Sequence, residues 1–440
     1  MIPSRKAGNV KNCLLILATA VAVTGNAALS EPNILLIIAD DMGLDASRCY
    51  DVGNQQAPMP NVEVLCANGL VFDNAYAQPT CSPTRATIMS GQYGFRTGVG
   101  APVARDGSDG LDPDIPTLFD ALAPTGYAAN LIGKWHITGR DAGYDLPARM
   151  GVPDYFGLID GGARDYFDWT AVEDGKEVQI EGYATTVLTD RAITWIAAQD
   201  APWFLWLAYT APHAPFHLPP DDLHTFDHLP GDGASIDEDP LPYYQAMLEA
   251  LDTEIGRLLT SMSAGERAQT IVMFIGDNGT PNQVLNGLYG DHQAKATLYD
   301  SGVHVPLIVS GPGVDAGRTD AFINASDLTA TIAGLAGAEF VSPDSRDFGP
   351  VLAGGEGSRD YITTDHFTTR QARGRGIHGW AIREGDYRLV VPKDAPAELF
   401  DLSSDPLEQT NLLADGGTDA FLRIEADLRA RREALIAPQH

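Results

Sequence analysis

The chain has 440 residues, of which 44% are hydrophobic and 20% charged, a composition typical of a globular protein with enough apolar material for a large core. Its 29 basic and 59 acidic residues give a formal net charge of −30, which excludes nucleic acid as an expected partner because it repels a polyanion. An anionic substrate would need a local cluster of cations, since the overall field opposes its approach.

Residues 1–30 are predicted to be a signal peptide. Three basic residues precede an apolar run at 13–23, and small residues follow at 25–28, the pattern of a secretory signal. The run is too short to cross a bilayer, and no later stretch is long enough to do so. We therefore expect an exported protein, periplasmic or secreted, with no membrane span. No oligomeric state is predicted.

Three cysteines lie beyond this segment: Cys49, Cys66 and Cys81. In an oxidising compartment the simplest pairing joins Cys49 to Cys66. That pairing leaves Cys81 as a lone thiol.

Apolar runs alternate with helical periods along the chain, which predicts an α/β fold with a large, mainly parallel or mixed sheet flanked by helices. Strands buried on both faces are expected to be uniformly apolar, and such runs occur at 33–39, 127–132, 203–209, 270–275 and 305–309. Apolar residues spaced by three and four predict an amphipathic helix over 244–262. A second helix is predicted over 327–336. The segment 227–240, rich in Gly, Pro and Asp, is predicted to be a surface loop.

The sequence changes in character near residue 348. Shorter strand patterns follow at 380–383 and 388–391, and an Arg-rich helix is predicted from residue 419. We therefore expect a catalytic α/β domain over 31–345 and a small C-terminal α+β subdomain over 346–440.

Polar, chemically capable residues come just after several of the predicted strands. They are Asp40 and Asp41, Lys134 and His136, His213, and Asp277 and Asn278. Open α/β sheets place their ligand crevice at the carboxyl ends of the strands. One Asp after a strand usually serves only a turn or a cap, but several cases with compatible chemistry predict a shared site.

Four of these residues are hard oxygen donors. Asp40, Asp41, Asp277 and Asn278 supply three carboxylates and an amide carbonyl, a set that suits Ca²⁺ or Mg²⁺ far better than Zn²⁺. Close carboxylates without a cation would repel one another. We predict Ca²⁺ in preference to Mg²⁺, because Ca²⁺ accepts six to eight oxygens and leaves positions for a substrate.

Cys81 is predicted to lie at the entrance of a short helix. Ser82 fits the N-cap, Pro83 the first helical position and Gly91 the helix end. The helix N-terminus and Arg85, one turn along, create a positive local field. Cys81 is therefore a candidate nucleophile, and a structural half-cystine is the alternative.

The motifs together resemble the formylglycine-dependent sulfatases of the alkaline phosphatase superfamily. They are Cys81-x-Pro-x-Arg85, Asp40-Asp41 in PNILLIIADDMG, Gly133-Lys134-Trp135-His136, Pro212-His213-x-Pro215, Gly276-Asp277-Asn278-Gly279 and Lys295 in KATLYDSGVHVP. The resemblance covers nearly the whole chain after residue 30 and extends to Glu398–Leu402, Asp405-Pro406-x-Glu408 and Asn411-Leu412.

The resemblance implies that a maturation enzyme oxidises Cys81 to formylglycine. One hydroxyl of the aldehyde hydrate would attack the sulfur of a sulfate ester, and the second would drive release of inorganic sulfate. The metal ligands implied are Asp40, Asp41, Cys81, Asp277 and Asn278. Asp277 is also a candidate for the base that activates the nucleophile.

The remaining roles also follow from the resemblance. His213 matches the acid that protonates the leaving alcohol, and His136 the base for the second hydroxyl. Lys134 and Lys295 match cations that hold the sulfate oxygens, and Arg85 supports the hydrate and a metal-bound carboxylate. The chain departs from the pattern after Lys295: many relatives carry Glu-Gly-Gly and then Arg there, whereas this chain has Asp300, Ser301, Gly302 and His304.

Two alternatives remain. A phosphonate monoester or phosphodiester hydrolase of the same superfamily tends to have His where this chain has Asn278, which favours the sulfatase. A non-catalytic protein that binds sulfated glycans would not need every catalytic position filled. The substrate is an aryl sulfate or a sulfated carbohydrate, and specificity is expected in the loops at 95–109, 139–168 and 216–240. His217 is a weaker candidate for the substrate pocket.

Overall fold

The computed structural model describes residues 1, 3, 31–53, 56–107, 109–368 and 378–437. The predicted signal peptide lies outside the described residues, apart from positions 1 and 3. Among the helices of the described residues, none combines the length and the apolar character that crossing a membrane requires.

Ten strands of the described residues form one mixed sheet. They are β1 (Asn33–Ala39), β2 (Leu70–Tyr76), β3 (Ala128–Gly133), β4 (Phe156–Gly157), β5 (Asp168–Glu173), β6 (Lys176–Glu181), β7 (Trp203–Ala208), β8 (Thr270–Gly276), β9 (Leu307–Ser310) and β10 (Gly317–Asn324). Their order is β10-β2-β9-β8-β1-β7-β3-β4-β5-β6. The central strands β8, β1, β7 and β3 are parallel, whereas β9 is antiparallel to both of its neighbours.

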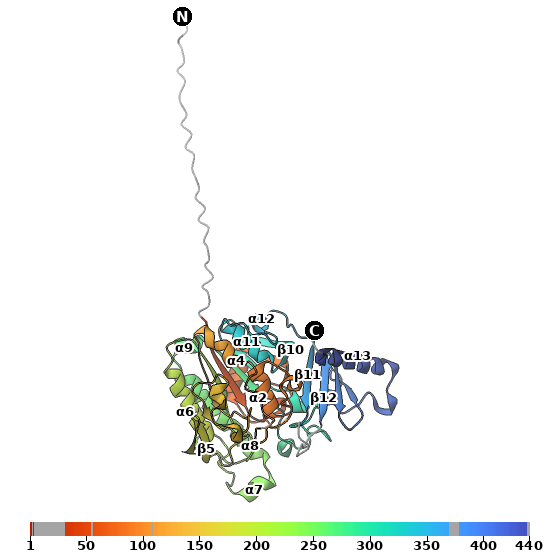
Figure 1. Ribbon diagram of the computed structural model, residues 1–440, viewed down its shortest axis with the longest axis horizontal. Helices are drawn as coiled ribbons and strands as arrows, with labels where there is room; N and C mark the ends of the chain where they lie inside the picture. The colour runs from red at the N-terminus through yellow and green to blue at the C-terminus, as the bar shows by residue number, and fades with distance from the viewer. Residues whose placement is uncertain (2, 4–30, 54–55, 108, 369–377, 438–440) are drawn as a thin grey trace. The chain divides into compact units, whose positions relative to one another are not determined.

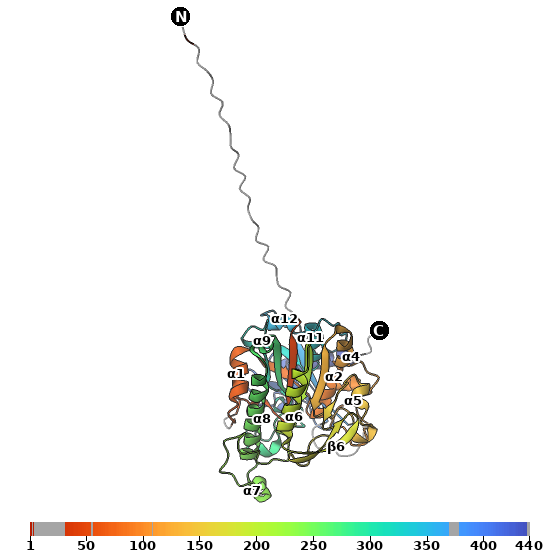
Figure 2. The same cartoon turned by 90° about the vertical axis from the view of Figure 1, so that its left-hand side faces the viewer.

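Both faces of this sheet are covered by helices (Figures 1 and 2). α1 (Pro60–Asn68), α6 (Ala184–Ala197) and α8 (Leu241–Ser261) pack together on one face, and α2 (Cys81–Ser90), α4 (Leu118–Leu122), α11 (Asp327–Leu335) and α12 (Gly349–Leu352) on the other. The sequence of β1 is uniformly apolar because both faces of this strand are buried. Leu36 faces one hydrophobic core and the next residue, Ile37, faces the other, as the alternation of a strand between two cores requires.

A smaller antiparallel sheet follows in the C-terminal part. Its order is that of the chain: β11 (Tyr361–His366), β12 (Gly379–Glu384), β13 (Tyr387–Pro392) and β14 (Glu398–Asp401). α13 (Asp419–Ile436) packs on β12 and β13. The division of the chain at residue 345 stays a prediction.

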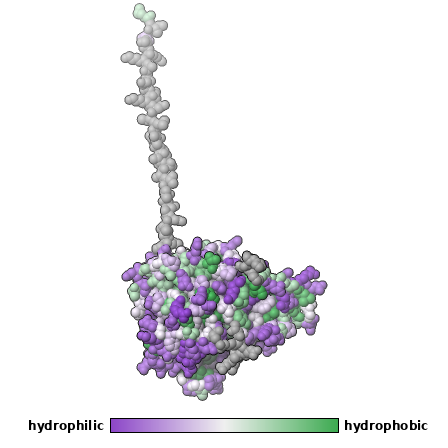
Figure 3. Space-filling view, viewed as in Figure 1, coloured by the Kyte–Doolittle hydropathy of each residue, from purple (hydrophilic) through white to green (hydrophobic). Residues whose placement is uncertain are grey.

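Short helices complete the fold. They are α3 (Gly94–Thr97), α5 (Leu146–Arg149), α7 (Gly233–Glu238), α9 (Ala264–Ala268), α10 (Asp300–Val303) and the 3-10 turns η1 (Leu44–Ala46), η2 (Ala123–Thr125), η3 (Arg140–Ala142), η4 (Asn282–Val284) and η5 (Ala414–Gly416). The face of the molecule in Figure 3 is largely hydrophilic, with apolar residues scattered among polar ones.

The predicted strands and both internal helices are confirmed, with shifts at their ends. The strand predicted at 305–309 is β9. Two local expectations were wrong: the loop at 227–240 contains α7, and α2 starts at Cys81 with Thr80 as its N-cap. The Ser82 hydroxyl instead accepts a hydrogen bond from the Val103 N–H (3.0 Å). This bond pairs a backbone N–H that would otherwise be buried without an acceptor.

Candidate active site

The polar residues that follow the central strands meet at one edge of the large sheet. β8, β1, β7 and β3 are neighbours and parallel, so their carboxyl ends adjoin. α2 begins at the same edge, and the loop between β8 and α10 returns to it. The structure links all the predicted site residues through mutual contacts: Asp40, Asp41, Cys81, Arg85, Lys134, His136, His213, Asp277, Asn278 and Lys295.

The turn after β1 presents two consecutive buried carboxylates. Asp41 has a left-handed backbone (φ 67°), a conformation that costs energy for a residue with a side chain. Its N–H donates to Oδ1 of Asp277 (2.9 Å), and its carbonyl accepts from the Tyr244 hydroxyl (2.9 Å). These bonds hold the turn, so that Asp40 and Asp41 both remain at the sheet edge.

Three carboxylates and one amide oxygen converge here. Oδ1 of Asp40 and Oδ1 of Asn278 are buried and have no hydrogen-bond partner among the described residues. The Asn278 amide nitrogen donates to Oδ1 of Asp41 (2.9 Å), which leaves the amide oxygen as an open acceptor. Burial, followed by the charge of Asp277, raises the pKa of Asp40 well above its usual range. A hard cation would satisfy both oxygens and offset this repulsion, so the donor set fits Ca²⁺ or Mg²⁺.

Arg85 and Lys134 bring buried positive charge to the site. The Arg85 guanidinium donates to Oδ2 of Asp277 (2.8 Å) and to the Lys134 carbonyl (2.8 Å), and the Lys134 ammonium pairs with Asp40. Burial disfavours both charges, but the neighbouring carboxylates outweigh it: Asp40 raises the pKa of Lys134, and Asp277 raises the pKa of Arg85. Both cations therefore stay charged away from water.

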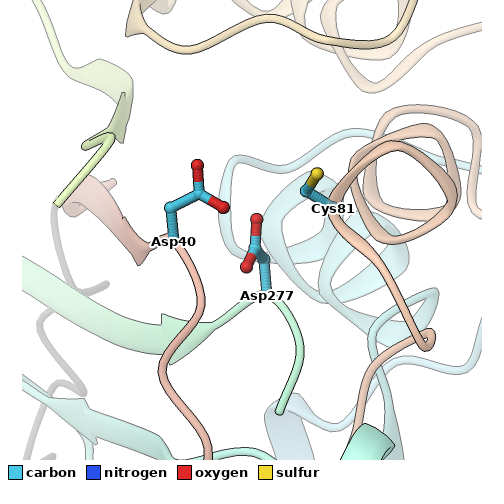
Figure 4. Close-up of side chains that lie close together, drawn as sticks. All are labelled: Asp40, Cys81 and Asp277. Carbon is cyan, nitrogen blue, oxygen red and sulfur yellow. The ribbon is translucent and has the colours of Figure 1, made fainter. Parts of the chain in front are cut away.

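Cys81 is the first residue of α2, and its thiol is buried and free of any disulfide. One side-chain atom each from Cys81, Asp40 and Asp277 lie within 4.8 Å of one another, and Figure 4 shows the three side chains around a common space. Cys49 and Cys66 form a disulfide, which confirms the expected pairing. The lone thiol thus lies against the carboxylate cluster, as a nucleophile at a metal site would.

Two histidines flank the cluster. Nδ1 of His136 lies 3.2 Å from Sγ of Cys81, and Nε2 of His213 lies 3.8 Å from Oδ2 of Asp41. Burial lowers the pKa of His136 well below its usual range. Burial also lowers the pKa of His213, to about 3, although Asp41 opposes this effect. Both rings are therefore neutral at pH 7 and able to exchange protons with a bound group.

Lys295 reaches the site from the loop after β8. Its ammonium lies 2.5 Å from Oδ2 of Asp41, and its backbone N–H donates to the Thr280 carbonyl (3.2 Å). Burial would lower the pKa of Lys295, but the Asp41 charge holds it above its usual value. Lys295 contacts Asp41, and Lys134 contacts Asp40. The two lysines bring two positive charges to the site, which provides a local anion site in an acidic chain.

Comparisons with known proteins agree with this geometry. The family model described as Sulfatase matches residues 32–338. The chain belongs to the sulfatase family. It is 28% identical to human Arylsulfatase A over 98% of this chain and 92% of that protein. It is 25% identical to an N-acetylglucosamine-6-O-sulfatase of Bacteroides thetaiotaomicron over 87% of this chain and 82% of that protein.

Solved structures share the fold. The crystal structure of Ps i-CgsB in complex with k-i-k-neocarrahexaose superposes with a TM-score of 0.79 and 24% identity, and covers 93% of each chain. This sulfatase is therefore a sulfuric ester hydrolase with an alkaline phosphatase-like fold. The family assignment supports sulfate ester hydrolysis over the phosphodiesterase and the non-catalytic glycan-binding alternatives.

The structure of this sulfatase also shows contributors that sequence reasoning missed. The Thr84 hydroxyl donates to the Asp277 carbonyl (2.7 Å) and accepts from the Gln78 N–H (2.9 Å). Thr84 thereby ties the helix that carries Cys81 to the turn after β8. The sequence could have indicated this role, because Thr84 lies three residues after Cys81 and therefore on the same side of the helix.

A glycine pair, Gly161-Gly162, lies against both histidines. A Cβ at Gly161 would come 2.7 Å from Cε1 of His136, and one at Gly162 would come 3.2 Å from Nδ1 of His213. The His136 N–H also donates to the Ile159 carbonyl (3.2 Å). The absence of side chains lets this backbone close over the two rings, a long-range contact that adjacent glycines alone do not reveal.

The C-terminal part of this sulfatase holds the loop that carries Lys295. Glu408 accepts from the Asp300 N–H (2.6 Å), and its carbonyl lies 2.7 Å from Nε2 of His292. Nδ1 of His304 lies 2.8 Å from Oδ2 of Asp300, at the positions where this chain was expected to depart from the family pattern. The contact spans one helical turn.

His217 lies outside the carboxylate cluster. Its ring packs against those of Tyr166 (4.2 Å between centroids) and Tyr183 (5.6 Å), and Nδ1 lies 2.9 Å from the Pro215 carbonyl. Its role in a substrate pocket stays a prediction.

Proposed function

We propose that this sulfatase hydrolyses sulfate esters through a formylglycine made from Cys81, with a formylglycine-generating maturation enzyme as its partner. The observation that carries the proposal is the position of Cys81: a free thiol at the start of α2, clustered with Asp40 and Asp277. A formylglycine hydrate would supply two hydroxyls on one carbon, one to attack sulfur and one to release sulfate. A serine would lack that second hydroxyl.

We propose Ca²⁺ as the resident ion. Asp40, Asp41, Asp277, Asn278 and the modified residue at position 81 would hold it, because two of their oxygens are buried without partners among the described residues and oxygen donors dominate the set. Bound Ca²⁺ would supply positive charge that favours a deprotonated nucleophile and polarises the sulfate.

The histidines have separate places in the proton transfers. Nδ1 of His213 lies 2.5 Å from the Ala214 carbonyl, so that this nitrogen carries the proton and Nε2 faces the site. In the neutral ring Nε2 carries no proton; it would act as the acid towards the leaving alcohol after taking up a proton, a charge that the nearby Asp41 carboxylate favours. His136, 3.2 Å from Sγ of Cys81, is placed to take the proton of a hydroxyl carried at position 81.

The cations bind the anionic group. Lys134 and Lys295 would contact the sulfate oxygens from two sides, while Arg85 fixes Asp277 at the end of α2. The N-terminal N–H groups of α2 add to the same positive field. This arrangement stabilises charge that develops on the sulfo group without any solvent rearrangement.

We propose that the protein is exported to the periplasm or secreted. The basic, apolar and small-residue pattern of residues 1–30 supports this, and so does the disulfide between Cys49 and Cys66, since such bonds persist in oxidising compartments. The substrate proposed is an aryl sulfate or a sulfated carbohydrate.

Peptide mass spectrometry around Cys81 tests the proposal. In protein produced with the maturation enzyme, we expect a loss of roughly 18 Da relative to cysteine, as CH₂SH becomes CHO, together with sulfate release from an aryl sulfate. Protein made without that enzyme should keep the thiol and be inactive, as should Cys81→Ala. Full activity with an unmodified thiol would overturn the mechanism.

A further inference from the structure

Asp45 lies four residues after Asp41, in the turn η1 that follows β1. Its Oδ1 accepts two hydrogen bonds, one from the Thr280 hydroxyl (3.0 Å) and one from the Tyr289 hydroxyl (3.1 Å). Both donors belong to the segment between β8 and α10, which also carries Lys295. One carboxylate oxygen therefore ties the chain that follows Asp41 to two points of the lysine segment.

Thr280 passes this restraint on to Lys295. The Thr280 hydroxyl donates to Asp45 and also accepts from the Gly43 N–H (3.1 Å). A hydroxyl that donates and accepts at the same time is held in one orientation. The Thr280 carbonyl accepts from the Lys295 N–H (3.2 Å). The side chain of Thr280 is thus fixed by the turn after β1, and its backbone in turn fixes that of Lys295.

The turn after β1 and Thr280 are in close contact. A Cβ on Gly43 would lie 2.8 Å from Oδ1 of Asp45 and 2.9 Å from the backbone nitrogen of Thr280. Thr280 is also buried, so a hydroxyl that lost its partners here would be costly. The two segments therefore cannot slide past each other without breaking the hydrogen bonds to Asp45.

The lysine segment depends on such contacts, because it has little regular structure of its own. Between β8 and α10 its described residues form only the 3-10 turn η4. The Lys295 ammonium must nevertheless stay at a fixed place, where it lies 2.5 Å from Oδ2 of Asp41. A displacement of about 1 Å in a group that binds the reacting part of a substrate can cost about 10² in rate.

We propose that Asp45 is a positioning residue that holds Lys295 in place for the sulfate group, through Thr280 and Tyr289. The inference rests on the proposed role of Lys295 in binding sulfate. Asp45 acts without contacting the substrate, so loss of its side chain should matter only while the Lys295 ammonium is present.

A double-mutant cycle on the mature enzyme, with 4-nitrophenyl sulfate as substrate, tests this proposal. Asp45→Ala should lower kcat/KM about ten- to a hundredfold, because the ammonium is misplaced. In the Lys295→Ala background the same change should cost less than about threefold, since the group that it positions is already absent. Asp45→Asn keeps an acceptor oxygen and should restore most of the activity.

Tyr289→Phe keeps the proposal testable if Asp45→Ala does not fold. It removes one of the two donors to Asp45 and nearly preserves the shape of the side chain. We expect a loss of about three- to tenfold in kcat/KM, again only when Lys295 is present.

Asp252→Asn is the matched control for a buried carboxylate with a purely structural role. Asp252 accepts from the N–H groups of Asn61 and Val62 at the start of α1. Its variant should lower the unfolding midpoint, while kcat/KM changes less than about twofold in both backgrounds.

Equal losses from Asp45→Ala and Tyr289→Phe with and without Lys295 would overturn the inference, because both residues would then act on something other than the lysine. Wild-type turnover in Lys295→Ala alone would remove the sulfate clamp and the inference with it. If the unaltered mature enzyme releases no sulfate, the proposed function itself fails.

Discussion

The sulfur of Cys81 lies 3.2 Å from Nδ1 of His136, and both residues are buried. The contact joins the start of α2 to the segment after β3, two elements that are 55 residues apart. It gives His136 direct access to whatever group residue 81 carries.

His136→Gln tests this assignment. If His136 removes the proton that drives sulfate release, the variant should still expel the alcohol once and then stop. We expect a burst of about one equivalent of 4-nitrophenol per active site followed by little turnover. His213→Gln should instead slow the burst itself. A variant His136→Gln with steady turnover and no burst would contradict the assignment.

Replacement of the lysines tests the sulfate clamp. Lys295→Ala and Lys134→Ala should each reduce kcat by about 10² to 10³, because each removes a fixed charge that faces the sulfate. Lys295 is partly exposed, so its variant should fold. Lys134→Ala leaves Asp40 buried without its partner, and its unfolding midpoint should be measured beside kcat. Lys393→Ala, on the surface, is the control, and wild-type turnover in both site variants would exclude the clamp.

Calcium should stabilise the protein as well as activate it. After treatment with EGTA, addition of Ca²⁺ at about 100 times its Kd should raise the free energy of unfolding by about 2.7 kcal/mol. Asp277→Asn and Asn278→Leu should weaken this shift, whereas Asp239→Asn, on the exposed end of α7, should keep it. Calorimetry measures the effect without an activity assay. Equal stabilisation of all four proteins would place the ion elsewhere.

Thr84 and Thr87 form a matched pair on α2. Both are buried, but Thr84 donates to the Asp277 carbonyl, whereas the Thr87 hydroxyl has no partner among the described residues. Thr84→Val should therefore cost about 1 to 3 kcal/mol of stability and Thr87→Val close to nothing. Urea unfolding of the two variants measures the difference. Equal costs would mean that the Thr84 hydrogen bond contributes no net stability.

His217 should make stability depend on pH. Burial lowers its pKa to about 4 from an ordinary value of 6.5, so on acidification the unfolded chain takes up the proton first. The stability that neutral His217 confers is present above pH 6.5 and is lost as pH falls towards 4. Between pH 6.5 and 4, we expect the free energy of unfolding of His217→Gln to fall by about 1 to 2 kcal/mol less than that of the wild type.

Urea unfolding at pH 7 and pH 4.5 checks the prediction for His217. His228→Gln, which alters an exposed histidine of the same region, serves as the control and should follow the wild type. Parallel pH dependence in all three proteins would show that His217 does not contribute.

Much of the fold and site could be predicted because it depends on local pattern. The apolar run of β1 must be buried on both faces, and a parallel sheet places Asp40 at the edge where Asp277 also emerges. The type of each residue then indicates its chemistry. In this way the sequence by itself determined the sulfatase family, the oxygen-donor set and Cys81 as the lone thiol.

Only the tertiary structure decided how the surroundings of these residues are built. The Thr84 hydrogen bond, the closure of Gly161 over His136 and the contact of Asp45 with Thr280 each join segments far apart in the chain. The antiparallel direction of β9 likewise depends on its partners β2 and β8. Such contacts arise when loops settle against one another, and no periodicity or motif in a single segment encodes them.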